Sequence, residues 1–243
     1  MDGGSLGRVC GRFLSLSSPD ELAERFGVDE VRTDPLPPRY NVAPTDEVYA
    51  ILESEERRRL GRLRWGFVPH WATQLKGTRQ PINARIEGVA TSRMFGDAFA
   101  RRRCLLPADG FYEWQDRGEG RRKQPFHLAA SDGSPLAFAG IWTVWRDPQA
   151  PEDASPLYSA AIVTTAAHGE MERIHERMPV ILPPQLWGAW LTAVPAEAPH
   201  LHAVVAAAAP PALTARAIGT RVNAVRNDGP ELLEAGSVDD EDD

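Results

Sequence analysis

Cysteine is almost absent from this chain of 243 residues, in which only Cys10 and Cys104 occur. Two cysteines cannot form the disulfide framework of a small secreted domain, and by themselves they cannot complete a four-ligand structural zinc site. The six histidines are scattered, and no close pairing of Cys, His and Asp indicates metal coordination. We therefore expect no metal and no cofactor. Any special cysteine chemistry must come from a single thiol.

Long apolar runs are also absent. No stretch approaches the ~20 residues that cross a bilayer, and the N-terminus lacks the basic segment followed by an apolar stretch that makes a secretory signal. The expected location is the cytoplasm, with no membrane partner. No internal repeat occurs, and neither of the Pro/Ala/Glu-rich segments at 147–156 and 193–199 follows enough independent core to mark a domain boundary. The sequence favours one domain, which we expect to be monomeric.

Lysine is rare, because only Lys76 and Lys123 contribute to the 27 basic residues. This excess of arginine, with heavy use of alanine and proline, is typical of a GC-rich genome. The formal charge of −7 argues against a generally basic nucleic-acid binder. However, the five acidic residues at 239–243 leave only about −2 for the rest of the chain. We predict that residues 236–243 form a solvated, disordered tail, so local basic patches elsewhere stay possible.

The order of polar, apolar and turn-forming residues predicts many short strands with interspersed helices. Helices are expected at residues 20–26, 169–177 and 184–191, and strands at 47–52, 60–67, 101–114, 126–129, 136–145 and 159–165. There is no βαβ rhythm, so we expect an α+β fold, a single domain with a largely antiparallel sheet or barrel flanked by helices. This domain would span residues 9–235.

Four stretches are too polar to be merely core: "NVAPT" at 41–45, "PINARIEGVATSRMF" at 81–95, "ADGFYEW" at 108–114 and "IHERMP" at 174–179. Each has an ordinary structural explanation. Glu113 fits a surface carboxylate on a strand, His175 fits a structural histidine, and Asn83 fits a helix cap. Taken one at a time, these signals are weak.

Together they are specific, because they occur in one order: CGRF, NVAP, WGFVP, INARxE, ADGFYEW and IHERMP, with VNAVRNDGPELLE near the end. This string resembles the SOS response-associated peptidase (SRAP) family, the abasic-site processing proteins, from Val9 to about Leu233. The resemblance implies the SRAP fold and an enzyme of the DNA damage response. It also implies a covalent link with abasic sites in single-stranded DNA, autoproteolytic processing, lyase-like Schiff-base chemistry and association with the nucleoid when bound to DNA.

The family's chemistry uses a cysteine exposed at the N-terminus. An abasic deoxyribose is partly an open-chain aldehyde, and a first-residue cysteine offers it an α-amine to form an imine and a thiol to close a thiazolidine. An interior cysteine has only an amide nitrogen, whose lone pair is delocalised, so it can form no more than a reversible hemithioacetal. The α-amine, with a pKa of about 7.7 to 8.0, is partly unprotonated at neutral pH.

By resemblance, four residues are catalytic. Cys10 is the nucleophile, Glu113 shuttles the amine proton or stabilises the iminium, Asn83 orients the nucleophile and sugar, and His175 protonates the ring oxygen as the sugar opens. Residues that match the DNA channel of the family are Arg12, Pro44, Trp71, Arg85, Arg93, Thr164 and Arg177. Each arginine has a solvated surface position or a structural ion pair as its alternative. Core positions are predicted for Cys104, Trp65, Trp114 and Trp142.

The sequence departs from the family pattern at its start, because eight residues precede Val9. Either Val9 marks the true start, since GTG also serves as a start codon that is read as methionine, with residues 1–8 as a leader outside the mature protein, or the leader is real and is removed by self-cleavage before Cys10. A second departure is Ala72, which follows Trp71 where the family often has another aromatic.

Two rival functions stay open. One is a cysteine hydrolase in which an interior Cys10 is activated by His175. The other is a noncovalent single-strand binder that uses arginines and tryptophans alone.

Overall fold

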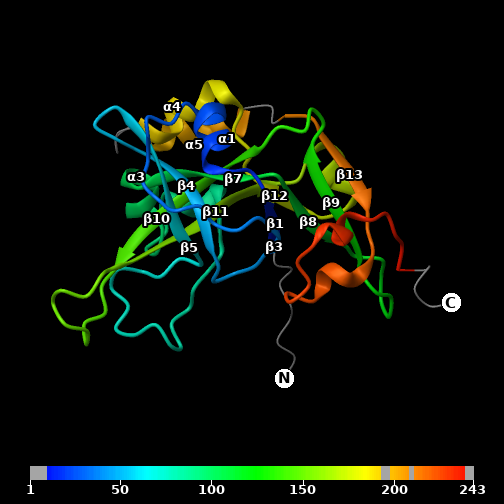
Figure 1. Ribbon diagram of the computed structural model, residues 1–243, viewed down its shortest axis with the longest axis horizontal. Helices are drawn as coiled ribbons and strands as arrows, with labels where there is room; N and C mark the ends of the chain where they lie inside the picture. Colours follow the sequence, from blue (N-terminus) through cyan, green and yellow to red (C-terminus); the bar gives the residue numbers. More distant parts are fainter. Residues whose placement is uncertain (1–9, 193–197, 208–210, 239–243) are drawn as a thin grey trace.

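The computed structural model describes residues 10–192, 198–207 and 211–238, so the leader at 1–8 and the end of the acidic tail lie outside the described residues. Figure 1 shows two sheets side by side with helices gathered above them. The first sheet has five strands in the order β13 (Leu213–Ala217), β9 (Gln124–Ala130), β8 (Gly110–Gln115), β1 (Arg12–Ser15) and β3 (Arg39–Val42).

The second sheet is closed on itself. Its strand order is β12 (Arg177–Pro179), β11 (Leu157–Ala166), β10 (Leu136–Trp145), β7 (Arg103–Ala108), β4 (Glu47–Ser54), β5 (Arg57–Trp65) and β2 (Glu30–Val31). A parallel pairing of Ser159 with Arg64 joins β11 back to β5, so these strands form a barrel. The short strand β6 (Asn83–Arg85) also runs parallel to β11. The other pairings are antiparallel except that of β2 with β5.

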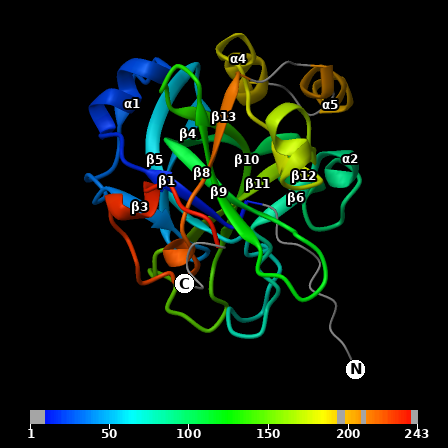
Figure 2. The ribbon, with the colours of Figure 1, turned by 90° about the vertical axis from the view of Figure 1, so that its right-hand side faces the viewer.

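Helices cover one face of the barrel. They are α1 (Pro19–Phe26), α2 (Ile86–Val89), α3 (Gly96–Arg101), α4 (Pro184–Thr192) and α5 (Ala198–Ala207), with 3-10 helices at η1 (Gly169–Arg173), η3 (Thr220–Asn223) and η4 (Pro230–Leu233). In Figure 1, α1, α4 and α5 lie together at the top, and Figure 2 shows α2 beside β6 and β12. The expected α+β domain is therefore confirmed.

Alternating side chains divide the core into two parts. Along β10, Ala139 and Ile141 pack in a cluster with the helices, where Trp187 and Trp190 of α4 lie. Phe138, on the opposite face, packs in a second cluster that includes residues of the five-stranded sheet. This is the period-2 alternation of a strand buried on both faces. The second cluster includes Phe13 of β1 and Phe111 of β8, so the five-stranded sheet packs against the barrel.

Helix α1 shows how local sequence fixes an element. Ser18 Oγ accepts from Glu21 N at 3.3 Å while Glu21 Oε2 accepts from Ser18 N at 2.7 Å, which is a capping box. Leu22 and Phe26 are buried, and Gly27 ends the helix with φ of 61°, a conformation that glycine adopts without strain. The helix predicted at 20–26 is thus confirmed.

One predicted helix and one structural alternative are wrong. Residues 169–177 are not one helix, because η1 ends at Arg173 and Arg177–Pro179 pair with β11. Asn83 does not cap a helix, since it lies in β6 and Arg85 precedes α2. In both cases the backbone pairs with β11 instead of forming the helix that local preference favours.

The predicted core residues fall into two groups. Trp65 and Cys104 are fully buried, as predicted. Trp114 and Trp142 are only half-buried and pack at the edges of their clusters. Packed structure continues to Val238, which is buried and donates its backbone N–H to Gln124 Oε1 at 3.0 Å.

Candidate active site

Glu113 and Cys10 meet through the backbone nitrogen of Cys10. This nitrogen lies 2.8 Å from Glu113 Oε2 and donates its hydrogen to the carboxylate. The pairing of Arg12 with Tyr112 places the two residues together, because it aligns the start of β1 with β8. Glu113 is only 2% exposed. A buried carboxylate therefore faces the nitrogen that would become the α-amine of a first-residue cysteine.

Burial is the main influence on the pKa of Glu113. It raises this pKa, while the hydrogen bond from Cys10, the nearby charge of His175, the backbone N–H of Trp114 and the charge of Lys123 oppose the rise. The net shift is upward, so the carboxyl group exchanges its proton at a less acidic pH than an exposed glutamate does. This is a suitable property for a proton shuttle.

The sulfur of Cys10 has a different environment from its nitrogen. Cys10 is fully buried, in the same apolar cluster as Met171 and Ile174, and its backbone is left-handed with φ of 41°. Burial, and next the charge of Glu113, raise the pKa of the Cys10 thiol well above its ordinary value. The sulfur is therefore held as a neutral thiol, because the thiolate is disfavoured there.

His175 lies between η1 and β12, close enough to Glu113 for its charge to lower the pKa of that carboxyl group. The backbone N–H of Arg177 donates to His175 Nδ1 at 3.0 Å, and the carbonyl oxygen of Arg177 is 3.2 Å from the same atom. A pocket of about 440 Å³ opens beside the imidazole. It is lined by Trp114, Gln115, Asp116, Lys123, Glu172, Arg173, Ile174, His175 and Glu176.

Asn83, Arg85, Thr164 and Arg177 are gathered along β11. Asn83 pairs with Ile162 and Arg85 with Thr164 across the β6 and β11 pairing, which leaves Asn83 half-buried and Arg85 exposed. Arg177 Nη2 donates to the carbonyl oxygen of Thr164 at 2.8 Å and lies 3.3 Å from its hydroxyl oxygen. The structure thus brings Arg85, Thr164 and Arg177 together at one end of β11.

Glu87 is a residue of this group that the sequence did not single out. Its carboxylate accepts from Arg177 Nη1 at 2.6 Å and from Nη2 at 3.0 Å. The side chain of Arg177 is 12% exposed, whereas that of Glu87 is 52% exposed. The only signal in the sequence was the position of Glu87 within "INARIEG".

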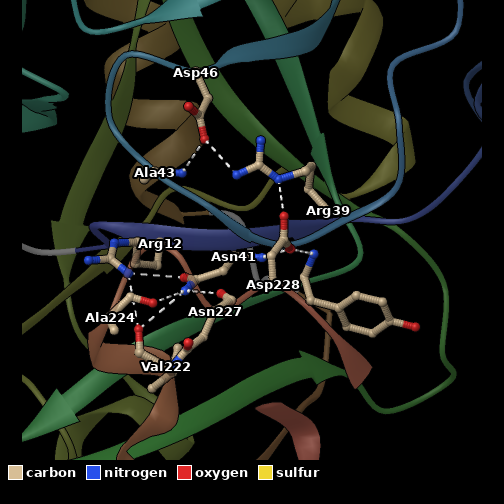
Figure 3. A network of polar contacts seen from close by, with 10 residues as sticks. Arg12, Arg39, Asn41, Ala43, Asp46, Val222, Ala224, Asn227 and Asp228 are labelled. Atoms are coloured by element: carbon tan, nitrogen blue, oxygen red, sulfur yellow. Dashed lines mark hydrogen bonds and ion pairs between the residues drawn. The ribbon is translucent and has the colours of Figure 1, made fainter. Parts of the chain in front are cut away.

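Arg12 lies in a separate polar network that joins β3 to the C-terminal segment (Figure 3). Arg12 Nη1 donates to Asn41 Oδ1 at 3.1 Å and to the carbonyl oxygen of Val222 at 3.0 Å. Asn41 Nδ2 contacts three carbonyl oxygens, those of Val222 at 3.3 Å, Ala224 at 3.2 Å and Asn227 at 2.9 Å. Partial burial lowers the pKa of Arg12, and the nearby charge of Asp46 opposes this shift.

Asp228 ties the same segment to β3 through a second set of contacts. Its Oδ1 accepts from the backbone N–H groups of Tyr40 at 2.6 Å and Asn41 at 3.0 Å, and its Oδ2 pairs with Arg39 Nε. Arg39 also pairs with Asp46 at 3.4 Å. Figure 3 shows these groups converging between the loop after β3 and the C-terminal segment. The "NVAP" and "VNAVRNDG" motifs therefore form one structural unit.

We expect Asn41→Ala to lower the free energy of unfolding by about 3 kcal/mol, because a fully buried amide leaves and its polar neighbours lose four contacts. Urea unfolding measures this difference. Asn223→Ala is the matched control, since Asn223 is exposed and its Oδ1 accepts one hydrogen bond, from Trp114 Nε1 at 2.7 Å. It should cost about 1 kcal/mol. Equal losses in the two variants would contradict the structural role of Asn41.

Pro44, Trp71 and Arg93 lie in loops outside the sheets. Pro44 is half-buried in the turn after β3, Trp71 is 57% exposed, and Arg93 is exposed between α2 and α3. Within the part of the chain that the structure describes, no hydrogen bond or ion pair joins Trp71 or Arg93 to the residues around Cys10.

The described ranges contain no group of three His, Cys, Asp or Glu side chains able to hold a metal ion. None of the helices in those ranges is long and apolar enough to span a membrane.

Comparison with known proteins identifies the family of the chain. The sequence profile described as SOS response associated peptidase (SRAP) matches residues 9–225. The chain therefore belongs to the SRAP family. Over 228 residues it is 34% identical to the abasic site processing protein YoqW of Bacillus subtilis (strain 168), covering 93% of this chain and 100% of YoqW.

Two further comparisons extend the likeness. Over 188 residues the chain is 34% identical to the abasic site processing protein YedK of Escherichia coli (strain K12), covering 75% of this chain and 79% of YedK. A solved structure of a protein from Bacteroides thetaiotaomicron superposes with a TM-score of 0.75 at 21% identity, covering 93% of this chain and 100% of the other. At this identity the likeness supports the fold alone.

Proposed function

We propose that this protein processes abasic sites in single-stranded DNA by capturing them covalently through Cys10, once Cys10 is the first residue of the chain. The observation that carries the proposal is the distance of 2.8 Å between the Cys10 nitrogen and Glu113 Oε2. It supplies a proton acceptor to the nitrogen that must attack. The names of the relatives, abasic site processing proteins, support the same substrate.

The capture has two bond-forming steps. The α-amine of Cys10 adds to the aldehyde carbon and gives a carbinolamine, which loses one water to form an imine. The thiol sulfur then adds to the imine carbon, and the thiol proton passes to the nitrogen as the thiazolidine ring closes. Glu113 accepts the amine proton and returns it to the departing hydroxyl. A neutral thiol suits the second step, because it carries the proton that the nitrogen receives.

His175 and Asn83 act before and around these steps. The closed sugar must open to its aldehyde, and we assign to His175 the proton donated to the ring oxygen. Asn83, at the edge of β11, orients the sugar and the nucleophile. The 440 Å³ pocket beside His175 gives solvent access to the imidazole.

The DNA contacts proposed are those of Arg12, Pro44, Trp71, Arg85, Arg93, Thr164 and Arg177. Arg85 and Arg93 are exposed and free to meet phosphates, and Trp71 has an exposed face on which a base can stack. Arg12 and Arg177 are largely committed to protein acceptors. We therefore expect Arg12 and Arg177 to contribute less to direct contacts with DNA than Arg85 and Arg93 do.

The two rivals fit the site less well. A thiol hydrolase needs a thiolate, and both burial and Glu113 oppose one at Cys10. A noncovalent binder gives no reason for a buried carboxylate at the Cys10 nitrogen. We propose in addition that residues 1–9 are absent from the working chain. Either translation starts at codon 9, read as methionine, and this methionine is then removed, or the protein cleaves itself before Cys10.

The test uses a chain that begins at Cys10 and a single-stranded oligonucleotide with one abasic site, resolved on a denaturing gel. We expect a shifted band that Cys10→Ala abolishes. Cys104→Ala is the control, because Cys104 is equally buried but lies in β7. A shifted band that survives Cys10→Ala, or that Cys104→Ala removes, would refute the assignment of Cys10.

A further inference from the structure

Arg177 holds the imidazole of His175 through its backbone. The N–H of Arg177 points at His175 Nδ1 from 3.0 Å. An N–H can donate only to a nitrogen with a free lone pair, so in the neutral imidazole this contact favours the tautomer with its hydrogen on Nε2. The carbonyl oxygen of Arg177, 3.2 Å from Nδ1, is placed to accept once that nitrogen is also protonated.

The side chain of Arg177 fixes the backbone that makes these contacts. The guanidinium bridges two elements, since it bonds to Thr164 in β11 and to Glu87 in α2. Both terminal nitrogens reach the two oxygens of Glu87, which is the bidentate arrangement with the most restricted geometry. The side chain of Arg177 is therefore held to both β11 and α2.

Glu87 supplies the charge that this arrangement needs. The Arg177 side chain is only 12% exposed, and a cation so far from water requires a partner. The hydrogen bonds from Arg177 lower the pKa of Glu87, so the carboxylate stays ionised across the neutral range. Because Glu87 itself is 52% exposed, its replacement by glutamine leaves the core intact.

We propose that Glu87 is a positioning residue for His175: it locks Arg177, and the backbone N–H and carbonyl oxygen of Arg177 hold the imidazole at Nδ1. The protonated ring then donates from Nε2, while its Nδ1–H stays on the carbonyl oxygen of Arg177. The catalytic role of His175 in this statement rests on the proposed function. Arg177 then serves to position His175, in addition to any contact with phosphate, and the glutamate of "INARIEG" serves to hold Arg177.

The first measurement is the tautomer of His175, read from ring nitrogen chemical shifts in protein labelled with 15N-histidine, without DNA and above about pH 8. His175→Gln assigns the signals. In the unaltered protein we expect the Nε2–H form to exceed the Nδ1–H form by about tenfold, and in Glu87→Gln we expect a mixture. A predominant Nδ1–H form in the unaltered protein, or an unchanged ratio in Glu87→Gln, would overturn the proposal.

The second measurement is the rate of adduct formation against DNA concentration. Glu87→Gln should lower the rate at saturating DNA by about tenfold and should not raise the half-saturating concentration, because a negative charge is removed. The matched control is Glu170→Gln, which removes the same charge from another arginine pair, Arg173 with Glu170 at 2.6 Å. It should leave the saturating rate unchanged.

The outcomes separate the two proposals. A tighter half-saturation with an unchanged saturating rate in Glu87→Gln would show that Glu87 merely competes with phosphate for Arg177, which overturns the positioning role. Absence of any adduct in the unaltered protein would refute the proposed function, while the tautomer measurement on DNA-free protein would still decide the role of Glu87.

Discussion

A chain that begins at Cys10 is expected to capture an abasic site, whereas the same chain with residues 1–9 attached is expected to capture none. The reason is the nitrogen of Cys10. In the longer chain it is an amide, whose lone pair is delocalised into the carbonyl group of residue 9 and cannot attack an aldehyde. In the shorter chain it is an amine with a pKa of about 7.7 to 8.0. Denaturing gels of both chains measure the difference.

Intact-mass measurement must accompany this comparison, because a chain that cleaves itself would convert the longer form into the shorter one. Every adduct should then have the mass of a chain that starts at Cys10. Stable adducts that retain residue 9 would contradict the thiazolidine mechanism. A shorter chain that forms no adduct would contradict it equally.

Glu113→Gln is expected to slow capture by about a hundredfold, the size typical of a lost acid-base group. In the unaltered protein the Cys10 nitrogen lies 2.8 Å from Glu113 Oε2. Glutamine preserves the shape of the side chain and still accepts this hydrogen bond, but it cannot take the amine proton. Single-turnover rates at saturating DNA measure the effect. A rate within threefold of the unaltered protein would remove Glu113 from the proton-transfer role.

The same substitution should make the protein more stable at neutral pH. The pKa of Glu113 is raised in the folded state, mainly by burial. Between the ordinary pKa and the raised one, the folded state binds more protons than the unfolded state, so stability falls as the pH rises through that window. Glutamine is uncharged, so the Glu113→Gln variant does not bury a negative charge on folding at neutral pH.

Urea unfolding at two pH values tests this linkage. Glu113→Gln should have the higher unfolding midpoint at neutral pH, and the difference should vanish below about pH 4, where the carboxyl group is protonated in both states. A stabilisation that is the same at both pH values would contradict an electrostatic cause.

The regular parts of the fold follow from local sequence. Alternating apolar residues predicted the strands at 136–145 and 159–165, and the structure has β10 and β11 there. The helix at 184–191 also forms, as α4. These elements form where local preference and burial agree, since successive apolar side chains of the strands alternate between the two large core clusters.

The parts that sequence reasoning missed depend on distant partners. The strand at Arg177–Pro179 exists because β11 offers an edge, which outweighs the helical preference of the residues before it. Glu87 and Arg177 are 90 residues apart, and Asn41 and Val222 are 181 apart. A periodic pattern of apolar residues cannot reveal contacts between residues so far apart in the sequence. Motif order therefore suggested the proposed catalytic residues, whereas the residues that hold them in place could be found only from the structure.

The left-handed backbone of Cys10 bears on the removal of residues 1–9. A φ of 41° in an L-residue brings Cβ close to the neighbouring carbonyl group and costs about 1–2 kcal/mol. The torsion φ is defined by the carbonyl carbon of the preceding residue, so a first residue has none. Hydrolysis of the bond before Cys10 would release this energy, so the local backbone conformation would favour the cleavage that the proposed chemistry requires.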